Sequence, residues 1–556
     1  MLKNSVNKSA DPCEDFHEFA CGKWMANNKI PDDQPSYSQF TKLQEKMYHS
    51  CMDVQSLNVV KSAEILEKIS QFGHWPIIHG KLGGEGEWDA NSFDLTQLFI
   101  SIKQSRDIGI FFDVDVSRRL LHFDQGNLGL DIGKRSSRDY YLNETRYAKQ
   151  LEAYEKYMNS KIRLFARDAG SQKTDQEIAE GVEAILDFEK KFAKILVPNE
   201  ERRNYTKMYN VRRFSQLPEI FGELDWQKYF VALMPEDMHF YLDTDPEIVI
   251  SDIKFFHYAS GAMYVRKYFN KEDRSTASAM VEDLRQSFMD LLSENDWMLE
   301  ETMMYALHKA NEMLSLIGFP DFIYNDTQLD EYYDDLLLDP NDSYSTMVEE
   351  SSLWALEKDF RRLIEEVDRE EFSPSSAFVN AFYTPEKNSI AFTAAILQPP
   401  FFDRSFPKAV NYGAIGSVMG HEITHGFDDE GSQFDRVGNL KNWWDENTLK
   451  QFLKRTKCII DQYSQYEVPG TGLKINGILT QGENIADNGG VKQAFNIWCA
   501  VTKPEAAVNQ VLTDPHSPKK FRVNGVLVNQ PAFAEAFNCP VGSKMNLKPE
   551  ERCSVW

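Results

Sequence analysis

The sequence lacks any apolar run close to the ~20 residues that a membrane-spanning helix needs. Its most apolar stretch, residues 390–402, is interrupted by a threonine, a glutamine and two prolines. The first twelve residues, MLKNSVNKSADP, contain no apolar core and therefore do not have the pattern of a signal peptide. From these features we expect neither a membrane anchor nor an export signal within the chain.

The chain also lacks a surplus of basic residues. It contains 61 Lys and Arg against 86 Asp and Glu, which gives a formal net charge of −25 over 556 residues. A surface of this sign repels phosphate backbones, so we expect no nucleic-acid partner. With 42% hydrophobic residues, the chain can form roughly two to four domains with a large buried core.

Cysteine pairs of the CxxC type are absent, which argues against a zinc site built from cysteines. The seven cysteines gather towards the two ends of the chain: Cys13, Cys21, Cys51, Cys458, Cys499, Cys539 and Cys553. Disulfides that join the ends would explain this distribution and imply an oxidising compartment. Scattered buried thiols are the alternative. The odd count leaves one thiol unpaired or marks missing sequence.

Glycosylation sequons give weak support for secretion, because their number is little above chance. They begin at Asn7, Asn143, Asn204, Asn325 and Asn341.

The chain does contain a long helical middle. Apolar residues recur at three- and four-residue spacing in residues 148–195 and 279–317, and residues 345–367 look similar. The second stretch is expected to stay helical up to Gly318–Pro320. These segments predict a mostly helical body.

The pattern changes after Ser373. The string VNAFYTPEKNSIAFTAAIL predicts two short strands around a Pro-Glu-Lys-Asn turn. A helix is expected from about Gly413 to His425, and another near Glu483. The C-terminal third is therefore expected to be a mixed α+β lobe that starts near residue 370.

The string HEITH spans residues 421–425. Residues four apart share one face of a helix, so His421 and His425 can reach the same metal ion. Glu422 then lies beside the metal, where it can take a proton from bound water. A helix with two surface histidines is the bland alternative.

A catalytic zinc needs a third protein ligand. The position where one metallopeptidase class carries a third histidine is occupied by Gly431. About twenty residues beyond the histidines, where another class carries a glutamate, stand Trp443, Trp444 and Asp445. Asp445 is a candidate ligand, although the two tryptophans before it favour a packed turn.

The string GENIADNGG offers a better candidate. Glu483 and Asp487 lie one helical turn apart, which suits one carboxylate on the metal and one behind a ligand. A metal-bound histidine usually donates its other N–H to a carboxylate, and Asp487 and Asp428 could serve this role. From spacing alone, an ordinary acidic helix start is as well supported as a metal ligand.

Several segments resemble the neprilysin and endothelin-converting-enzyme family of zinc metallopeptidases. They are HEITHGFDDEG, GENIADNGG, VNAFY, ILQPPFF, the C-terminal CSVW and the opening DPCEDFHEFACGKW. The resemblance covers most of the chain. It implies a two-lobed, gluzincin-type fold in which a helical cap encloses a central chamber. We expect an N-terminal segment (1–50) packed on the catalytic lobe, a cap (51–370) and a zinc catalytic domain (371–556).

The resemblance also implies roles for individual residues. His421, His425 and Glu483 become the ligands of one Zn²⁺ ion, and Glu422 becomes the general base. The other residues carried over are Asp428 and Asp487 as partners of the histidines (Asp487 counted as catalytic), His516 as the oxyanion donor, and Asn380, Ala381 and Arg522 as substrate-binding residues.

Two further sets follow from the resemblance alone. The implied disulfides are Cys13–Cys539, Cys21–Cys499 and Cys458–Cys553. The implied hydrophobic specificity pocket contains Phe40, Ile396, Phe401, Val418 and Trp498; ordinary core packing is the alternative for each.

The chain departs from the family pattern in four places. The short cytosolic tail and membrane helix that usually begin family members are not in this chain, so any membrane anchoring would require a segment absent from it. We expect tens of residues, including the partner of Cys51, to be skipped between Asp252 and Gly261, and a second segment to be skipped between Gln493 and Trp498. Where neprilysin holds a free carboxylate with arginines, this chain offers Ser36 and Gln44.

We therefore expect a zinc metalloendopeptidase that cleaves oligopeptides or peptide hormones. By resemblance it acts at the extracellular face of the plasma membrane or as a secreted protein. A catalytically impaired, splice-like variant with a binding role or none is the alternative, because the skipped segments could remove core.

Overall fold

The computed structural model divides the chain into two compact units. One consists of Met1–Met52, His257–Leu329 and Asp368–Trp556; the other consists of Asp53–Phe256 and Asp330–Val367. The division assigns residues 257–329 to the same unit as the C-terminal third, whereas the predicted cap included them. The structure describes residues 5–31, 36–44, 94–106, 112–117, 120–125, 138–196, 256–339, 342, 344–493 and 500–556.

The first unit is mainly helical and has short strands. Its helices are α1 (Phe16–Asn27), α14 (His257–Tyr268), α15 (Lys271–Ser293), α16 (Glu300–Asn311), α19 (Lys408–Asn411), α20 (Ser417–His425), α21 (Glu446–Tyr463), α22 (Gln481–Gln493), α23 (Pro504–Thr513), α24 (Lys519–Leu527) and α25 (Pro531–Ala536). Its strands are β1 (Ser36–Ser38), β4 (Leu314–Gly318), β5 (Ala381–Thr384), β6 (Ser389–Thr393), β7 (Glu467–Val468), β8 (Leu473–Lys474) and β9 (Ala500–Thr502). Helix α17 (Asp326–Tyr332) crosses the boundary between the units.

A three-stranded mixed sheet forms the centre of the first unit. Its order is β4-β6-β5, with β4 parallel and β5 antiparallel to β6. All five residues of β6 are buried, as a central strand requires, while β5 lies at the edge. The predicted hairpin is confirmed: β5 and β6 flank a turn at Pro385–Lys387, and Asn388 adopts a positive φ of 43°.

The structure corrects the prediction that a helix continues up to Gly318. Helix α16 ends at Asn311, and Leu314–Gly318 form strand β4 instead. The five residues pair in register with β6, from Leu314 opposite Ser389 to Gly318 opposite Thr393. Because this pairing partner lies more than seventy residues further along the chain, local periodicity could not reveal it.

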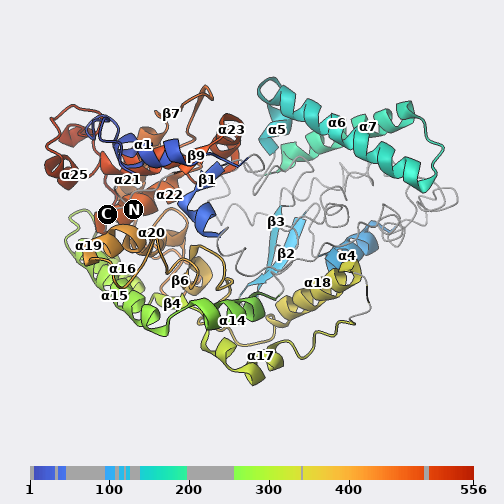
Figure 1. Cartoon of the computed structure of the whole chain (residues 1–556), viewed down its shortest axis with the longest axis horizontal. Helices are drawn as coiled ribbons and strands as arrows, with labels where there is room; N and C mark the ends of the chain where they lie inside the picture. Colours follow the sequence, from blue (N-terminus) through green and yellow to red (C-terminus); the bar gives the residue numbers. More distant parts are fainter. Residues whose placement is uncertain are drawn as a thin grey trace. The chain divides into compact units, whose positions relative to one another are not determined.

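The N-terminal segment packs on the C-terminal helices. Phe16, Trp24 and other residues of α1 share one buried cluster with Val523, Leu527 and Phe533, and α1 lies among the C-terminal helices in Figure 1. Strand β1 pairs with β9. The predicted disulfides Cys13–Cys539 and Cys458–Cys553 are confirmed. Cys21 is also disulfide-bonded, and Cys499, its predicted partner, lies outside the described residues, as do Cys51 and Trp498.

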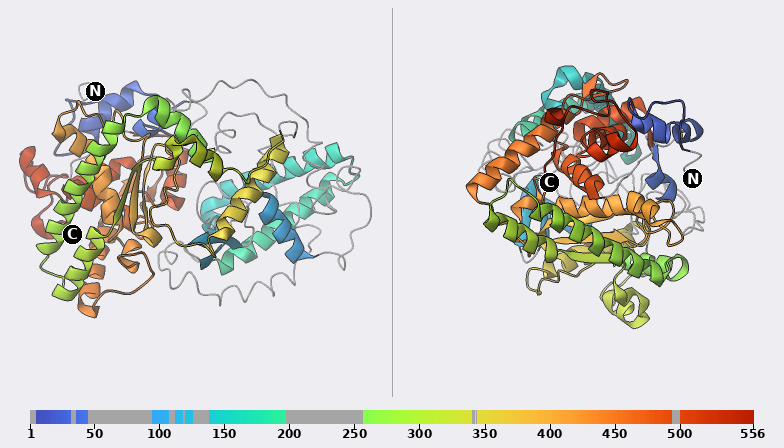
Figure 2. Two further views of the ribbon diagram at one scale, coloured as in Figure 1. Left: turned by 90° about the horizontal axis from the view of Figure 1, so that it is seen from below. Right: turned by 90° about the vertical axis from the view of Figure 1, so that its left-hand side faces the viewer.

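The second unit contains the long helices that the sequence predicts. They are α6 (Glu144–Ala169) and α7 (Asp175–Ile195), which lie side by side in Figures 1 and 2. The unit also contains α4 (Leu95–Arg106), α5 (Arg138–Leu142), α18 (Tyr344–Arg361) and a hairpin of β2 (Phe112–Ser117) and β3 (Leu120–Gln125). Buried Glu189 of α7 accepts hydrogen bonds from Tyr141 and Tyr154 at 3.1 Å each, which fixes α7 against α5 and α6.

The described part of the chain is therefore mainly α, as predicted. Strands β5 to β9 lie in the C-terminal third, whereas β1 to β4 come from earlier residues. Within the described ranges, no helix combines the length and apolar character needed to cross a membrane.

Candidate metal centre

Two histidines face one another at the end of a buried helix. Helix α20 is buried from Ser417 to Thr424, which its apolar and small residues permit. His421 and His425 lie one turn apart, and their Nε2 atoms are 2.9 Å from each other. Both imidazoles therefore present a nitrogen atom to the same point.

Helix α22 brings a carboxylate to that point. Glu483, in its first turn, places Oε2 3.3 Å from His421 Nε2 and 3.7 Å from His425 Nε2. Asp487, one turn later, lies 2.9 Å from His421 Nδ1. Because the two residues are four apart on one helix face, Glu483 reaches the Nε2 atoms of both histidines, while Asp487 reaches Nδ1 on the other side of the His421 ring.

The close approach of α20 and α22 depends on two glycines. A methyl group added to Gly489 would lie 2.4 Å from Thr424 Oγ1, and one added to Gly490 would lie 2.7 Å from the backbone nitrogen of His421. Larger residues would force the helices apart. The pair at the end of GENIADNGG is therefore what allows Glu483 to reach the histidines.

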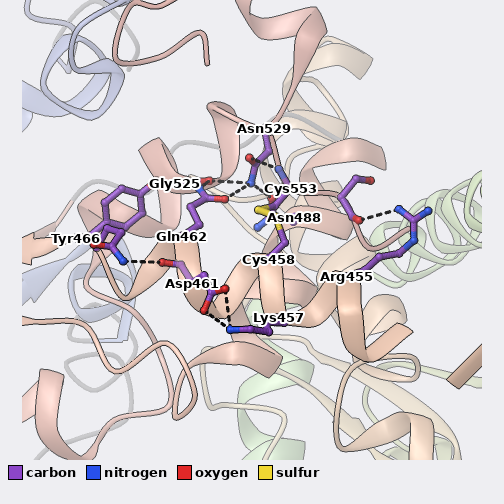
Figure 3. The surroundings of a disulfide bond; sticks show 12 residues. Arg455, Lys457, Cys458, Asp461, Gln462, Tyr466, Asn488, Gly525, Asn529 and Cys553 are labelled. Carbon is purple, nitrogen blue, oxygen red and sulfur yellow. Dashed lines mark hydrogen bonds and ion pairs between the residues drawn. A yellow bond between two sulfur atoms is a disulfide. The ribbon is translucent and has the colours of Figure 1, made fainter. Parts of the chain in front are cut away.

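The polar residues on the back of α22 fix its position. Asn488 accepts a hydrogen bond from Asn529, which also donates to Gln462 of α21 and accepts from the backbone of Cys553. Figure 3 shows this network around the Cys458–Cys553 disulfide. On the same helix, buried Asn484 accepts from Ser517 at 2.8 Å.

The three predicted ligands fit a divalent metal ion. One donor atom from each of His421, His425 and Glu483 lies within 4.8 Å of the other two. The Oε2 atom of Glu483 is buried without a hydrogen-bond partner, with Arg522 Nη2 3.6 Å away and His421 Nε2 3.3 Å away, and a bound cation would satisfy it. Two imidazole nitrogens and one carboxylate oxygen are a donor set of catalytic zinc sites, which keep a fourth position open.

A second carboxylate orients His425. Asp428 lies just beyond α20, and its Oδ2 is 2.7 Å from His425 Nδ1. Its Oδ1 accepts backbone hydrogen bonds from Glu430 and Gly431 at 2.8 and 2.7 Å. A carboxylate held in this way fixes the ring of a histidine so that Nε2 points at the metal.

Electrostatics favour positive charge where the donor atoms meet. Burial opposes ionisation of Glu483, but His516 and His425 hold its pKa well below the usual range. Burial also opposes charge on Asp487, yet the Arg522 guanidinium lowers its pKa to about 2. For His425, burial is outweighed by Glu483 and Asp428, which raise its pKa to about 10.

The proposed general base behaves differently from these carboxylates. Glu422 is only 6% exposed, and burial raises its pKa, although His421 and His425 oppose the rise. A carboxylate with a raised proton affinity beside the metal ligands is suited to accept and return a proton.

His516 and Arg522 both face α22. His516 Nε2 lies 3.1 Å from Glu483 Oε1, and its Nδ1 lies 2.7 Å from Asp514. Arg522 of α24 binds Asp487 through two hydrogen bonds of 2.6 and 2.7 Å. The guanidinium predicted to hold substrate is thus also the partner of a carboxylate behind His421.

The predicted substrate strand, β5, is one of the two outer strands of the sheet. Asn380 precedes β5, and Ala381 is its first residue. The side chain of Gln44 accepts a hydrogen bond from Val379 N at 2.7 Å, just before this strand. The alternative ligand Asp445 instead caps α21 by accepting from Thr448, so it is not a metal ligand here.

The residues of the predicted hydrophobic pocket are largely buried. Ile396, Phe401 and Val418 belong to the core, and the rings of Phe40 and Phe401 are 4.5 Å apart. Sequence reasoning did not identify Gly490, Asp514 or the buried Lys309. Only the double glycine carried a visible signal, since small residues in a helix often mark close packing.

A helical fold with a paired-histidine helix and a glutamate from a second helix defines a gluzincin-type zinc metallopeptidase. The model of peptidase family M13 matches residues 380–497 and 493–553, and the N-terminal model of the same family matches residues 12–47, 45–258 and 250–320. The chain therefore belongs to peptidase family M13, the neprilysin and endothelin-converting-enzyme family of zinc metalloendopeptidases.

Individual relatives agree with this assignment. Neprilysin-1 of Caenorhabditis elegans is 43% identical, with 100% of this chain and 90% of the relative covered. Neprilysin-11 of the same organism is 35% identical, with 100% and 80% covered. The zinc metalloprotease ZMP1 of Mycobacterium tuberculosis, solved in complex with inhibitor, has a TM-score of 0.80 at 26% identity and covers 100% of this chain and 99% of its own.

The comparisons also bear on the skipped segments. The alignment with neprilysin-1 runs over 690 residues, although this chain has 556. The family matches break at residues 250–258 and 493–497, where the sequence suggested missing segments. A further break at residues 45–47 was not foreseen.

Proposed function

We propose that this chain hydrolyses oligopeptides at a zinc ion held by His421, His425 and Glu483, with Glu422 as the general base. The observation that carries the proposal is the meeting of three donor atoms beside a buried glutamate oxygen that lacks a hydrogen-bond partner. Zinc bound there would polarise the scissile carbonyl and lower the pKa of a water molecule.

The protein's own residues would do the rest. Glu422, with its raised pKa, accepts the proton of the attacking water and later gives a proton to the leaving amine. His516 donates to the oxyanion that develops on the substrate. Asp428 and Asp487 hold the two imidazoles in the orientation that ligation needs, and Arg522 holds Asp487.

The substrate would bind as an additional strand. Strand β5 is an outer strand of its sheet, and an extended peptide can pair with such an edge. Asn380 and Ala381 lie at its start, close to α20, which contacts β5. Arg522 would grip a substrate carbonyl. Peptides are thus the expected partners, at the extracellular face of a membrane or in a secreted form.

Gln44 supports internal cleavage over release of C-terminal dipeptides. Its side chain is bound to backbone groups of Val379 and Ala377, and it carries no charge for a free carboxylate. Cleavage of matched peptides with amidated and free C-termini tests this point. Similar kcat/KM values for the two are expected, whereas a marked preference for the free acid would contradict it.

The test of the main proposal uses a fluorogenic peptide, a chelator and two variants. Wild-type protein is expected to bind one zinc ion and to lose activity with the chelator. Glu422→Gln is expected to keep zinc and lose turnover, while Glu483→Gln loses zinc affinity. Zinc binding that is unchanged in Glu483→Gln would overturn the ligand assignment.

The second candidate is that this chain is a catalytically impaired, splice-like form with a binding role or none. It is kept because the matches to the family models break at three places in this chain. A folded, zinc-loaded wild-type protein that cleaves no peptide in a broad library would favour it over the enzyme.

A further inference from the structure

A buried lysine packs against the loop 426–436, which follows helix α20. Lys309 of α16 is 0% exposed, and its Nζ donates to the carbonyl oxygens of Gly431 and Phe434 at 2.6 and 2.7 Å. The amine also lies 5.4 Å from the ring centre of Phe427 and 5.7 Å from that of Trp443. Lysine is rarely buried to this extent, so its position needs an explanation.

The loop that Lys309 holds is the one that carries Asp428. Gly431 receives the lysine at its carbonyl oxygen and donates its own N–H to Asp428 Oδ1. Asp428 Oδ2 in turn lies 2.7 Å from His425 Nδ1. A short chain of polar contacts therefore runs from Lys309 to the imidazole proposed to bind zinc.

The loop is folded tightly onto the end of α20. A methyl group added to Gly431 would lie 1.9 Å from the carbonyl oxygen of His425. The carbonyl that Lys309 binds and the N–H that donates to Asp428 belong to the two peptide units that meet at Gly431. Holding one of these units in a loop this crowded restricts the movement of the other.

The backbone of Lys309 joins the same loop to the substrate strand. The Nδ2 of Asn388 donates to Lys309 O at 3.1 Å and to Arg436 O at 2.9 Å. Asn388 occupies the turn between β5 and β6. Lys309 thus contacts both the loop that follows α20 and the turn between β5 and β6.

We propose that Lys309 is a positioning residue for the metal centre: its amine holds the loop 426–436 so that Asp428 orients His425. The proposal rests on the ligand assignment made above and concerns a residue that touches neither metal nor substrate. The simpler reading is that Lys309 only satisfies two buried carbonyls and contributes to stability.

Lys309→Met separates the two readings, because methionine fills similar volume without donating. Loss of a direct partner of a ligand, here Asp428, typically lowers metal affinity by about 10–100-fold. Because Lys309 acts through Asp428, we expect Lys309→Met to lower zinc affinity by up to this amount, measured by competition with a chromogenic chelator, and to lower kcat with little change in KM.

Thr302→Val is the matched control. Thr302 is buried on the same helix and donates at 2.7 Å to Asp445, the N-cap residue of α21. The variant Thr302→Val should lower the melting temperature without changing zinc affinity. If Lys309→Met lowers zinc affinity no more than Thr302→Val at equal stability, the positioning role is wrong.

A double-mutant cycle with Asp428→Asn completes the test. If Lys309 acts through Asp428, adding Lys309→Met to Asp428→Asn should cost little further zinc affinity, whereas independent effects would multiply and overturn the proposal. If Lys309→Met does not fold, Lys309→Gln serves in the same cycle. A wild-type protein that binds no zinc would instead refute the ligand assignment, so the two failures are distinguishable.

Discussion

Gly490 of α22 lies directly against His421 of α20, so that a methyl group on Gly490 would come within 2.7 Å of the His421 backbone nitrogen. The helices that carry the proposed metal ligands are thus brought together at a contact that only glycine permits. The distances within the site depend on this contact, because Glu483 is on the same rigid helix as Gly490.

Gly490→Ala should therefore weaken the metal centre. Alanine normally stabilises a helix relative to glycine by about 1 kcal/mol, but overpacking here should cost about 1–3 kcal/mol and move α22 away from His421. We expect lower zinc affinity and lower kcat, measured by metal competition and peptide hydrolysis. Gly261→Ala in α14, where the nearest atom outside the helix is 3.3 Å away, is the control. Equal zinc affinity in both variants would contradict the expectation.

His516→Ala should slow the chemical step more than it weakens binding. Removing one donor to a developing oxyanion typically lowers kcat by about 100–1000-fold. KM should change little, and zinc affinity should fall far less than in Glu483→Gln, although His516 contacts Glu483. Steady-state kinetics with metal analysis would check this. A higher KM with an unchanged kcat would assign His516 to substrate binding instead.

Lys309 should make stability depend on pH. Burial lowers its pKa to about 7 from 10.5, although Asp428 and Asp435 act in the opposite direction. Between these values the unfolded chain holds a proton that the folded chain has released, so the contribution of Lys309 to stability rises with pH. From pH 7.5 to 9.5 the wild type should gain on the order of 2 kcal/mol relative to Lys309→Met in denaturant unfolding. A difference that is constant with pH would refute this.

The disulfide between Cys458 and Cys553 should contribute strongly to stability. It joins α21 to the C-terminal tail across 95 residues, and bonds of this kind typically stabilise by about 2–5 kcal/mol. The double variant Cys458→Ser/Cys553→Ser should melt at a clearly lower temperature than the wild type. The wild type under reducing conditions should melt no higher than this variant, because a reductant also breaks the Cys13–Cys539 bond. Identical melting curves for wild type and variant would show that the bond is dispensable.

Two sequons should differ in glycan occupancy when the chain passes through a secretory pathway. Asn325 is exposed at the start of α17, where its Oδ1 accepts from Thr327. Asn7 is half-buried, and its Nδ2, the atom that would carry the glycan, donates to Glu18 at 2.9 Å. Enzymatic glycan release in heavy-oxygen water followed by mass spectrometry should label Asn325 and leave Asn7 unlabelled. The reverse pattern would contradict this account.

The local elements were largely predictable. The apolar periodicity of residues 148–195 predicts α6 and α7, because each helix buries one continuous face. The HEITH spacing predicts that His421 and His425 share a face of α20, and residues 379–397 predict the hairpin of β5 and β6. Leu314–Gly318 could not be predicted, because their pairing with β6 comes from distant residues.

The sequence by itself determined the chemistry that is available: two imidazoles one turn apart, a glutamate between them, and an acidic helix start ending in two glycines. It could not distinguish Glu483 from an ordinary helix carboxylate, and it gave no sign that Lys309 lies under the metal loop. The tertiary structure places the Glu483 carboxylate beside both imidazoles, because α20 and α22 pack against each other at Gly489 and Gly490. It also places the Lys309 amine against the loop 426–436. Contact between residues far apart in the chain is a property of packing, which no local pattern encodes.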